Sequence, residues 1–290
     1  VFGAGICGGT IHNAILYDNT ATSEAGAALA ATLLNCTVVE NSASLAGGIS
    51  YSTARNTILY DNMDSGGYPN YRNSSMSYCC TAPHPGEDNF SANPRLTATY
   101  RLTSTSPCID LAGLDAPPTD IDGETRFNYP LVPQAFDNAA DIGADEYVDV
   151  DLDTLADSYE QQYTGGLTML GNGDADGDDL SDSTEYTLGS TPTDPDSDHD
   201  GQDDSDEWIA GTGLRDPASR FEFRQIHFGG DVTLQWVSAT GRTYRVRTAP
   251  AMPGPWQDAA TGLTGTAGLY QWQHTPTSPA TFYQVRVTKP

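Results

Sequence analysis

Three short segments of the chain place carboxylates at the same five positions of a twelve-residue window. The windows are residues 149–160, 174–185 and 196–207, and each has an acidic residue at positions 1, 3, 5, 9 and 12. Calcium is a hard cation that takes about six to eight oxygen ligands. A loop with carboxylates at these positions and a backbone carbonyl at position 7 can wrap it. The spacing therefore predicts three calcium sites.

The predicted ligands are the five carboxylates of each window and the carbonyl oxygen of its seventh residue. They are Asp149, Asp151, Asp153, Leu155, Asp157 and Glu160; Asp174, Asp176, Asp178, Leu180, Asp182 and Glu185; and Asp196, Asp198, Asp200, Gln202, Asp204 and Glu207. Position 6 of such a loop favours a positive φ, which Gly201 supplies and Thr154 and Asp179 supply less readily. We therefore expect affinity to fall from the third window to the second and then the first.

Charge favours a metal over other partners. The chain has 39 acidic and 13 basic residues, and 19 of the acidic residues fall within 149–207, where no Lys or Arg occurs. This charge would repel nucleic acid and anionic membranes, and the apolar runs are too short for a membrane helix. Acidic tracts are usually disordered linkers, but the regular spacing favours calcium. His199 is expected to face solvent, since zinc would require softer ligands beside it.

Each window leads into a short amphipathic segment that ends near glycine, as in SYEQQYTGG, STEYTLGS and DEWIAGTG. These segments suit single helical turns and are too short for paired EF-hands. From 149 to about 220 the arrangement resembles thrombospondin type 3 repeats of bacterial secreted proteins. The resemblance implies a string of calcium ions with little hydrophobic core, with Asp194, Asp203, Asp206 and Asp216 bridging neighbouring sites. Extracellular modules bind calcium at about 0.1 to 1 mM, so we expect a secreted or cell-surface location.

An internal repeat occupies the start of the chain. TIHNAILYDN (10–19), TLLNCTVVEN (32–41) and TARNTILYDN (53–62) align without gaps at spacings of 22 and 21 residues. This period predicts a parallel β-helix with one coil per repeat. Two asparagine ladders are expected, one of Asn13, Asn35 and Asn56 and the other of Asn19, Asn41 and Asn62. The expected inward residues are Ala14, Cys36, Thr57, Leu16, Val38 and Leu59, although the opposite phase, with Ile15 and Tyr17 inward, stays open.

Three further motifs follow in order: SPCID at 106–110, DIDGETR at 120–126 and DIGADE at 141–146. With them, residues 1 to about 147 resemble the C-terminal end of bacterial surface right-handed parallel β-helix proteins of the choice-of-anchor Q type. After the third repeat we expect a loop-rich excursion before this closing segment. Its acidic residues and one arginine favour a capping layer that shares a guanidinium, over a second metal or sugar site. They are Asp110, Asp120, Asp122, Asp141, Glu146 and Arg126.

Two other groups of residues leave alternatives open. The column Asp18, Glu40 and Asp61 allows polysaccharide cleavage by carboxylates, but solvated side chains at a corner of the solenoid are favoured. The cysteines Cys7, Cys36, Cys79, Cys80 and Cys108 lack zinc-ligand spacing. Either Cys79 or Cys80 forms a disulfide with Cys108, or all five are small core residues.

The tail alternates apolar and polar residues from Phe221 onwards, which predicts an antiparallel sandwich. It resembles fibronectin-like or immunoglobulin-like modules of secreted bacterial proteins. Trp236, Tyr244, Trp256 and Trp272 are expected to pack in its core, with sugar stacking as the alternative.

The chain is thus predicted to be mainly β, with a parallel β-helix end at 1–147, calcium-binding repeats at 148–219 and a sandwich at 220–290. No Ser-His-Asp set, GxxxxGK or HExxH motif is present. We expect a non-enzymatic, calcium-stabilised extracellular structural or adhesive protein. Its expected partners are calcium, other copies of itself that pair with the open first coil, and surface polysaccharide. The alternative is a polysaccharide lyase or hydrolase, or its glycan-binding remnant.

Overall fold

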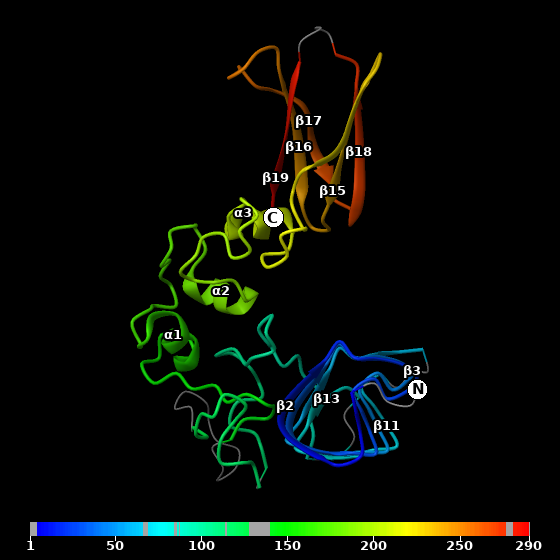
Figure 1. Cartoon of the computed structure of the whole chain (residues 1–290), viewed down its shortest axis with the longest axis vertical. Coiled ribbons are helices and arrows are strands. Elements are labelled where there is room, and N and C mark those ends of the chain that lie inside the picture. Colours follow the sequence, from blue (N-terminus) through cyan, green and yellow to red (C-terminus); the bar gives the residue numbers. More distant parts are fainter. Residues whose placement is uncertain are drawn as a thin grey trace. The chain divides into compact units, whose positions relative to one another are not determined.

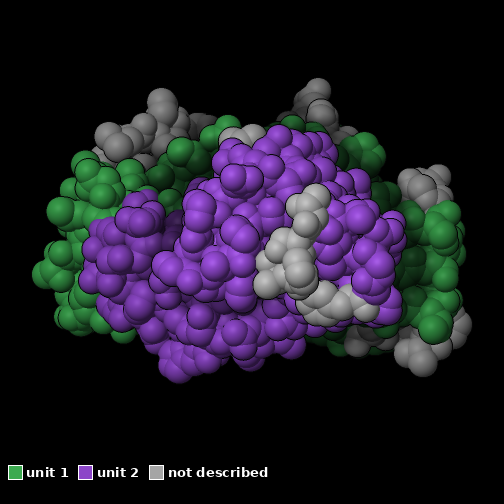
Figure 2. Space-filling view, turned by 90° about the horizontal axis from the view of Figure 1, so that it is seen from above, with its two compact units in different colours: residues 1–173, 182–189 green, residues 174–181, 190–290 purple. Residues whose placement is uncertain are grey.

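The computed structural model describes residues 5–65, 69–83, 86, 88–113, 115–127, 140–276 and 281–289. The chain is mainly β and divides into two compact units (Figure 2). Unit 1 comprises residues 1–173 and 182–189, and unit 2 comprises residues 174–181 and 190–290. Among the described residues, no helix is both long and apolar enough to cross a membrane.

Unit 1 begins with a β-solenoid whose coils stack three parallel sheets (Figure 1, blue to cyan). The first sheet contains β1 (Ile6–Cys7), β4 (Ala28–Leu29), β7 (Ile49–Ser50) and β11 (Tyr71–Arg72). The second contains β3 (Thr20–Glu24), β6 (Ser42–Leu45) and β10 (Met63–Asp64). The third contains β2 (Thr10–Tyr17), β5 (Thr32–Val39), β8 (Thr53–Arg55), β9 (Ile58–Tyr60), β12 (Ser75–Ser77) and β13 (Cys80–Thr81). The predicted parallel β-helix is confirmed, because Thr10 pairs with Thr32 and Thr32 with Thr53, in the register of the repeat.

One predicted asparagine ladder forms in full. The side-chain amide of Asn19 donates to Asn41 Oδ1 at 2.8 Å, and that of Asn41 donates to Asn62 Oδ1 at 2.9 Å. Asn62 continues the column to Asn70, at 3.0 Å. Each amide therefore satisfies polar groups of the next coil, which stabilises the stack.

The other predicted ladder forms only between Asn35 and Asn56. The amide of Asn56 donates to Asn35 Oδ1 at 3.0 Å, whereas that of Asn13 donates to the Thr119 carbonyl at 2.7 Å. All three asparagines have φ between 47° and 49°, a left-handed conformation that asparagine tolerates well. The expectation for Asn13 was wrong because its amide bonds the later segment that covers this corner.

The predicted inward phase is confirmed. Cys36, Val38 and Leu59 are fully buried in the solenoid core, and Ala14 and Leu16 pack against it. Tyr17, from the opposite phase, is 55% exposed.

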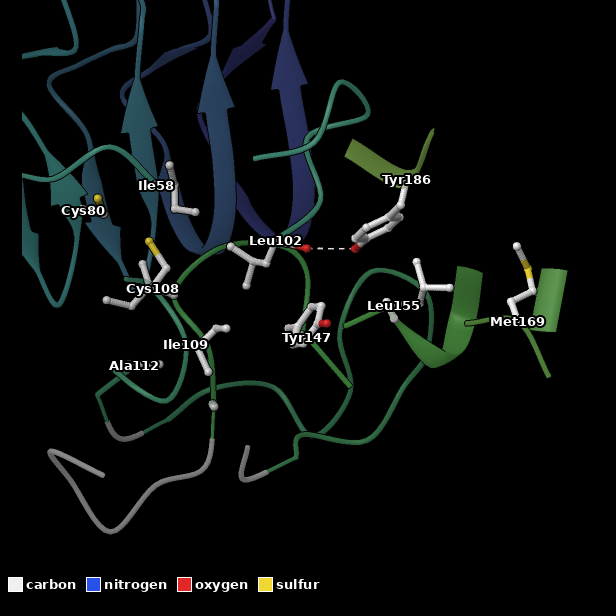
Figure 3. Packing of buried hydrophobic residues seen from close by; sticks show 13 residues of the cluster. Ile58, Cys80, Leu102, Cys108, Ile109, Ala112, Tyr147, Leu155, Met169 and Tyr186 are labelled. Atoms are coloured by element: carbon white, nitrogen blue, oxygen red, sulfur yellow. Dashed lines mark hydrogen bonds between the residues drawn. The ribbon is translucent and has the colours of Figure 1, made fainter. Parts of the chain in front are cut away.

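Part of the outer face of the third sheet, at Thr37 and Ile58, is also buried, because the chain after the solenoid packs along it. Ile58 on β9 joins Leu102, Ile109 and Tyr147 in a second cluster (Figure 3). Backbone bonds support this contact: Gly143 N–H donates to the Asn56 carbonyl at 3.0 Å. The closing segment therefore lies against the side of the coils.

Strands β11, β12 and β13 add to the solenoid where a loop-rich excursion was expected. Ser75 pairs with Thr53, and Cys80 pairs with Ile58, so the coil period continues. The prediction was wrong here because Tyr78, with φ 53°, occupies the corner where the repeats have asparagine.

Three helices begin within the acidic windows: α1 (Asp157–Thr164) and α2 (Asp182–Leu188) in unit 1, and α3 (Asp204–Ala210) in unit 2. Each begins at window position 9 and is followed by a left-handed glycine, namely Gly165, Gly189 or Gly211. Such a glycine ends a helix because it adopts positive φ without strain. These are the short helical segments that the sequence predicts. Leu155 and Met169 beside α1, and Tyr186 of α2, pack into the same cluster as Ile58 (Figure 3).

The C-terminal part of unit 2 contains two three-stranded antiparallel sheets, ordered β14-β15-β18 and β17-β16-β19 (Figure 1). The strands are β14 (Phe223–Phe228), β15 (Val232–Ser238), β16 (Thr243–Ala249), β17 (Gln257–Thr264), β18 (Gly268–His274) and β19 (Phe282–Thr288). Trp236 and Tyr244 are buried between the sheets and Trp272 packs against them, whereas Trp256 is half-buried. The sequence pattern did not predict β17, because its residues are small and polar and lack apolar alternation.

Candidate metal centres

The first window brings all five of its predicted carboxylates into two overlapping groups. Oxygens of Asp149, Asp151 and Asp157 lie within 4.8 Å of one another, as do those of Asp151, Asp153 and Glu160. Asp151 belongs to both groups. The whole window lies within unit 1.

Backbone donors fix the turn of the first window. Asp149 accepts hydrogen bonds from the N–H groups of Asp153 and Thr154, both at 3.2 Å, and Asp153 accepts one from Leu155 at 2.9 Å. Thr154, at position 6, has φ 85°. The window thus adopts the positive φ expected at position 6, although a β-branched residue occupies it.

The third window, within unit 2, has the same turn. Asp196 accepts from Asp200 N–H at 3.2 Å and from Gly201 N–H at 2.8 Å, and Asp200 accepts from Gln202 N–H at 2.9 Å. Oxygens of Asp196, Asp198 and Asp200 lie within 4.8 Å of one another. Gly201 has φ 92°, so glycine stands where the turn requires it.

The second window is divided between the units. Asp174, Asp176 and Asp178 form a close oxygen group in unit 2, and Asp178 accepts from Leu180 N–H at 2.7 Å. Position 6 is Asp179, with φ 77°. The remaining predicted ligands, Asp182 and Glu185, are buried on α2 in unit 1.

The helices place positions 9 and 12 on one face of a first turn, three residues apart. At position 9, Asp204 accepts from the Ser197 N–H and hydroxyl at 3.1 and 2.6 Å, and Asp157 accepts from Val150 N–H at 2.9 Å. These aspartates therefore fix the second residue of the window to the first turn of the helix. At position 12, Glu160 and Glu207 are fully buried.

Glu160 and Glu207, at position 12, combine full burial with carboxylate oxygens that lack a hydrogen-bond partner. Oε1 of Glu160 accepts from Met169 N–H at 3.0 Å, while its buried Oε2 has no hydrogen-bond partner. Neither buried carboxylate oxygen of Glu207 has a hydrogen-bond partner of good geometry. Burial, reinforced for Glu160 by Asp153 and for Glu207 by Asp198 and Asp200, raises the pKa of both to about 7. A buried carboxylate without a partner is costly, and a cation at this place would remove that cost.

The closing segment of unit 1 is a contrasting acidic cluster, because it contains two arginines that pair with its carboxylates. Arg126 bonds Glu146 Oε2 at 2.7 Å, and Arg101 pairs with Asp122 at 2.9 Å and Asp145 at 3.7 Å. The expectation of a single shared guanidinium was wrong, because a second one, that of Arg101, pairs with Asp122. Oxygens of Asp120, Asp122 and Asp145 do approach one another, but Arg101 supplies the positive charge that a metal would bring.

Two more residues of this layer, Asp110 and Asp141, are fully or almost fully buried, and Asp141 Oδ1 accepts from Asp110 N–H at 2.7 Å. Asp141 Oδ2 accepts from Tyr147 N–H at 2.8 Å. These bonds tie successive turns of the closing segment together, as a structural layer should.

Other predicted residues have local roles. His199 is exposed, its Nδ1 lies 2.7 Å from the Asp196 carbonyl oxygen and its Nε2 lies 3.5 Å from Asp194. Asp216 accepts from Ala218 N–H at 3.1 Å. Bridging of sites by Asp194, Asp203, Asp206 and Asp216 stays a prediction.

Supporting residues outside the windows could not be predicted from spacing. The Tyr147 hydroxyl donates to Asp149 at 3.1 Å, and Gly171 N–H donates to Asp153 at 2.8 Å. Arg220 lies 3.5 Å from Asp200 in the third window. These contacts arise from tertiary packing, and no repeated pattern in the sequence indicates them.

The five cysteines are free thiols, and all but Cys7 are buried. The structure therefore does not contain the disulfide from Cys79 or Cys80 to Cys108. The Cys80 and Cys108 thiols nevertheless contact each other through a hydrogen bond that lowers the pKa of Cys80, while burial raises the pKa of Cys108.

No known family model matches this chain, and no curated protein matches it. The assignment of chemistry to the windows therefore depends on their own geometry.

Proposed function

We propose that this chain is a calcium-stabilised, non-enzymatic structural or adhesive protein of the bacterial cell exterior. The observation that carries the proposal is the buried glutamate at position 12, whose carboxylate in the first and third windows has at least one oxygen without a hydrogen-bond partner. The other carboxylates of these two windows lie beside the same turn. A divalent cation is the partner that this arrangement lacks.

Calcium is the cation that fits the donor set. The windows offer carboxylate oxygens on an irregular loop, and calcium accepts about six to eight oxygens in flexible geometry. Magnesium requires a near-ideal octahedron, and zinc prefers nitrogen and sulfur ligands. Affinities of extracellular calcium modules, about 0.1 to 1 mM, suit a location outside the cell. The finer resemblances, to thrombospondin type 3 repeats and to the closing segment of choice-of-anchor Q solenoids, belong to this proposal.

Calorimetric titration of the calcium-free chain tests the proposal. We expect about three bound ions per chain. Glu207→Gln and Glu160→Gln should each remove or greatly weaken one site, because each takes away the ligand that a calcium loop binds through both oxygens. Glu222→Gln, an exposed change of the same charge outside the windows, is the control. An unchanged titration of both window variants would overturn the proposal.

A further inference from the structure

A pocket of unit 1, remote from the acidic windows in sequence, combines two carboxylates with aromatic and apolar walls. It has a volume of about 230 Å³ and lies between the solenoid and residues 93–100. Its polar lining comes from Glu40, Asp61, Asn93, Thr97 and Tyr100, and the rest comes from Val39, Tyr60, Pro94 and Leu96. Binding sites in proteins are typically concave, with a few polar groups that converge on the ligand.

The solenoid brings the two carboxylates together. Val39 pairs with Tyr60 in adjacent parallel strands, so Glu40 and Asp61 follow at the same corner of neighbouring coils. Strands in a sheet lie about 4.8 Å apart, which places the two side chains at the spacing of one coil. The negative charge of Glu40 adds to burial in raising the pKa of Asp61.

Tyr100 fixes one side of the pocket. Its hydroxyl donates to Glu40 Oε2 at 2.8 Å, and burial and this bond raise the pKa of Tyr100 to about 12. Its ring packs on that of Tyr17, with the centroids 5.1 Å apart. Tyr17 is 55% exposed, so an aromatic surface continues from the pocket to solvent.

These features select the ligand by charge and shape. The two carboxylates favour a cation. Asn93 Oδ1 and Thr97 Oγ1 already accept hydrogen bonds from the N–H groups of Arg95 and Arg101, at 2.8 and 3.0 Å, so few oxygens are left for a hard divalent metal. An organic ammonium satisfies both charge and shape, since it pairs with the carboxylates and places its carbon skeleton against the apolar wall and tyrosine rings. The volume is below the range of about 300 to 1,000 Å³ for drug-sized ligands, which suits a single sugar ring.

We propose that this pocket binds the protonated amine of a hexosamine, with Glu40 and Asp61 as the anionic partners and the Tyr17–Tyr100 pair as the surface against which the saccharide stacks. The proposal is independent of calcium and of the acidic windows. It involves binding alone and no chemical step.

Calorimetry with the glucosamine disaccharide tests the proposal on the full chain at about 1 mM calcium and 0.15 M salt, where long-range attraction is screened beyond about 8 Å. The N-acetylated disaccharide, which has the same rings without the charge, should bind at least about tenfold more weakly, because a hydrogen bond to a charged group contributes about 1.5 to 3 kcal/mol. Equal binding of both saccharides would overturn the proposal.

Glu40→Gln and Asp61→Asn should each weaken the amino sugar by about tenfold or more. Asp18→Asn is the matched control, since Asp18 holds the same corner position on the first coil and is not among the residues that line the pocket. Loss of affinity in all three variants would indicate only general attraction to an acidic chain, and would refute the site. Binding of lysine amide without binding of the amino sugar would refute the saccharide assignment. Thermal melting of each variant separates loss of binding from loss of folding.

Discussion

At the scale of single residues, backbone hydrogen bonds hold the like charges of the acidic windows close together. In the first and third windows the aspartate at position 1 accepts the N–H groups of positions 5 and 6, and in all three windows the aspartate at position 5 accepts that of position 7. These bonds use some carboxylate oxygens and turn the remaining ones toward one another. Preorganisation of this kind reduces the entropy lost on binding.

The backbone at position 6 should limit calcium affinity in the first window. A non-glycine residue with positive φ costs about 1 to 2 kcal/mol, and Thr154 is β-branched as well. Thr154→Gly should therefore raise the affinity of the first site by about fivefold to thirtyfold in calorimetric titration. Asp179→Gly, in the second window, should give a smaller gain because aspartate tolerates this region better. An equal or larger gain at Asp179 would contradict the argument.

The pKa of Glu124 gives unit 1 a dependence of stability on pH. Burial, with the charges of Asp120 and Asp122, raises this pKa from 4.5 to about 7, and its buried Oε2 lacks a hydrogen-bond partner. The folded chain thus binds a proton that the unfolded chain releases at lower pH. The contribution to stability is complete below about pH 4.5, declines as pH rises, and is lost above about pH 7.

Urea unfolding of Glu124→Gln and of the unmutated chain, both in chelator, measures this contribution. The variant should be the more stable of the two near pH 8, and the difference should shrink toward pH 5. A difference in stability that does not change with pH would show that Glu124 is ionised in the folded chain throughout.

At the scale of elements, the repeat allowed the solenoid to be predicted. Each coil places the same types of residue at its corner and in its core, at the same positions of the repeat. The asparagine column and the inward alternation both follow from stacking at a period of about 22 residues. Two features could not be predicted this way. The strands at 71–81 lack the corner asparagine, and the closing segment covers the outer face of β9 through contacts far apart in sequence. For the windows, spacing predicted the carboxylates that form close oxygen groups, which are all five in the first window and those at positions 1, 3 and 5 in the other two. Packing decided that Glu160 and Glu207 would be buried.

Substitution within the complete asparagine ladder should lower stability most at its middle residue. Asn41 is fully buried, donates to the Leu16 and Val39 carbonyls and accepts from Asn19. Asn41→Ala should lower the free energy of unfolding by about 2 to 4 kcal/mol, because several buried groups lose partners. Asn19→Ala, at the end of the column, should cost less. Denaturant unfolding followed by circular dichroism compares them, and equal costs would contradict the ladder.

The contact between the Cys80 and Cys108 thiols joins β13 to the closing segment. Mild oxidation by a small-molecule disulfide should convert this pair into an intramolecular disulfide through thiol exchange, with the reagent leaving as two thiols. Peptide mapping without reduction should detect the cross-link, and Cys80→Ser should abolish it. Cross-linking of Cys79 to Cys108 instead would show that Cys79, and not Cys80, faces the closing segment.

At the scale of the whole molecule, repulsion among the carboxylates of the acidic windows should affect how compact the chain is. The formal net charge is -26, and 19 carboxylates fall in the stretch 149–207 without a Lys or Arg. Three divalent ions would cancel six of these charges. Removing them should increase repulsion within the stretch and loosen the helices that carry positions 9 and 12.

Addition of a chelator should therefore increase the hydrodynamic radius and lower the melting temperature, and millimolar calcium should reverse both changes. Sedimentation velocity and scanning calorimetry measure these effects. Added sodium chloride at matched ionic strength is the control, since it screens charge without occupying the windows. If salt alone restored the calcium-loaded state, general screening would account for the effect.

The asparagine column also has an evolutionary consequence. Each coil presents to the next the same row of donors and acceptors that it received from the previous one, and Asn70 continues the row after an interval of only eight residues. A gene segment encoding one period can therefore be duplicated or deleted without changing the residues at the new junction. Such a change would also alter the contacts of the closing segment, because that segment bonds Asn13, Asn35 and Asn56 on three successive coils.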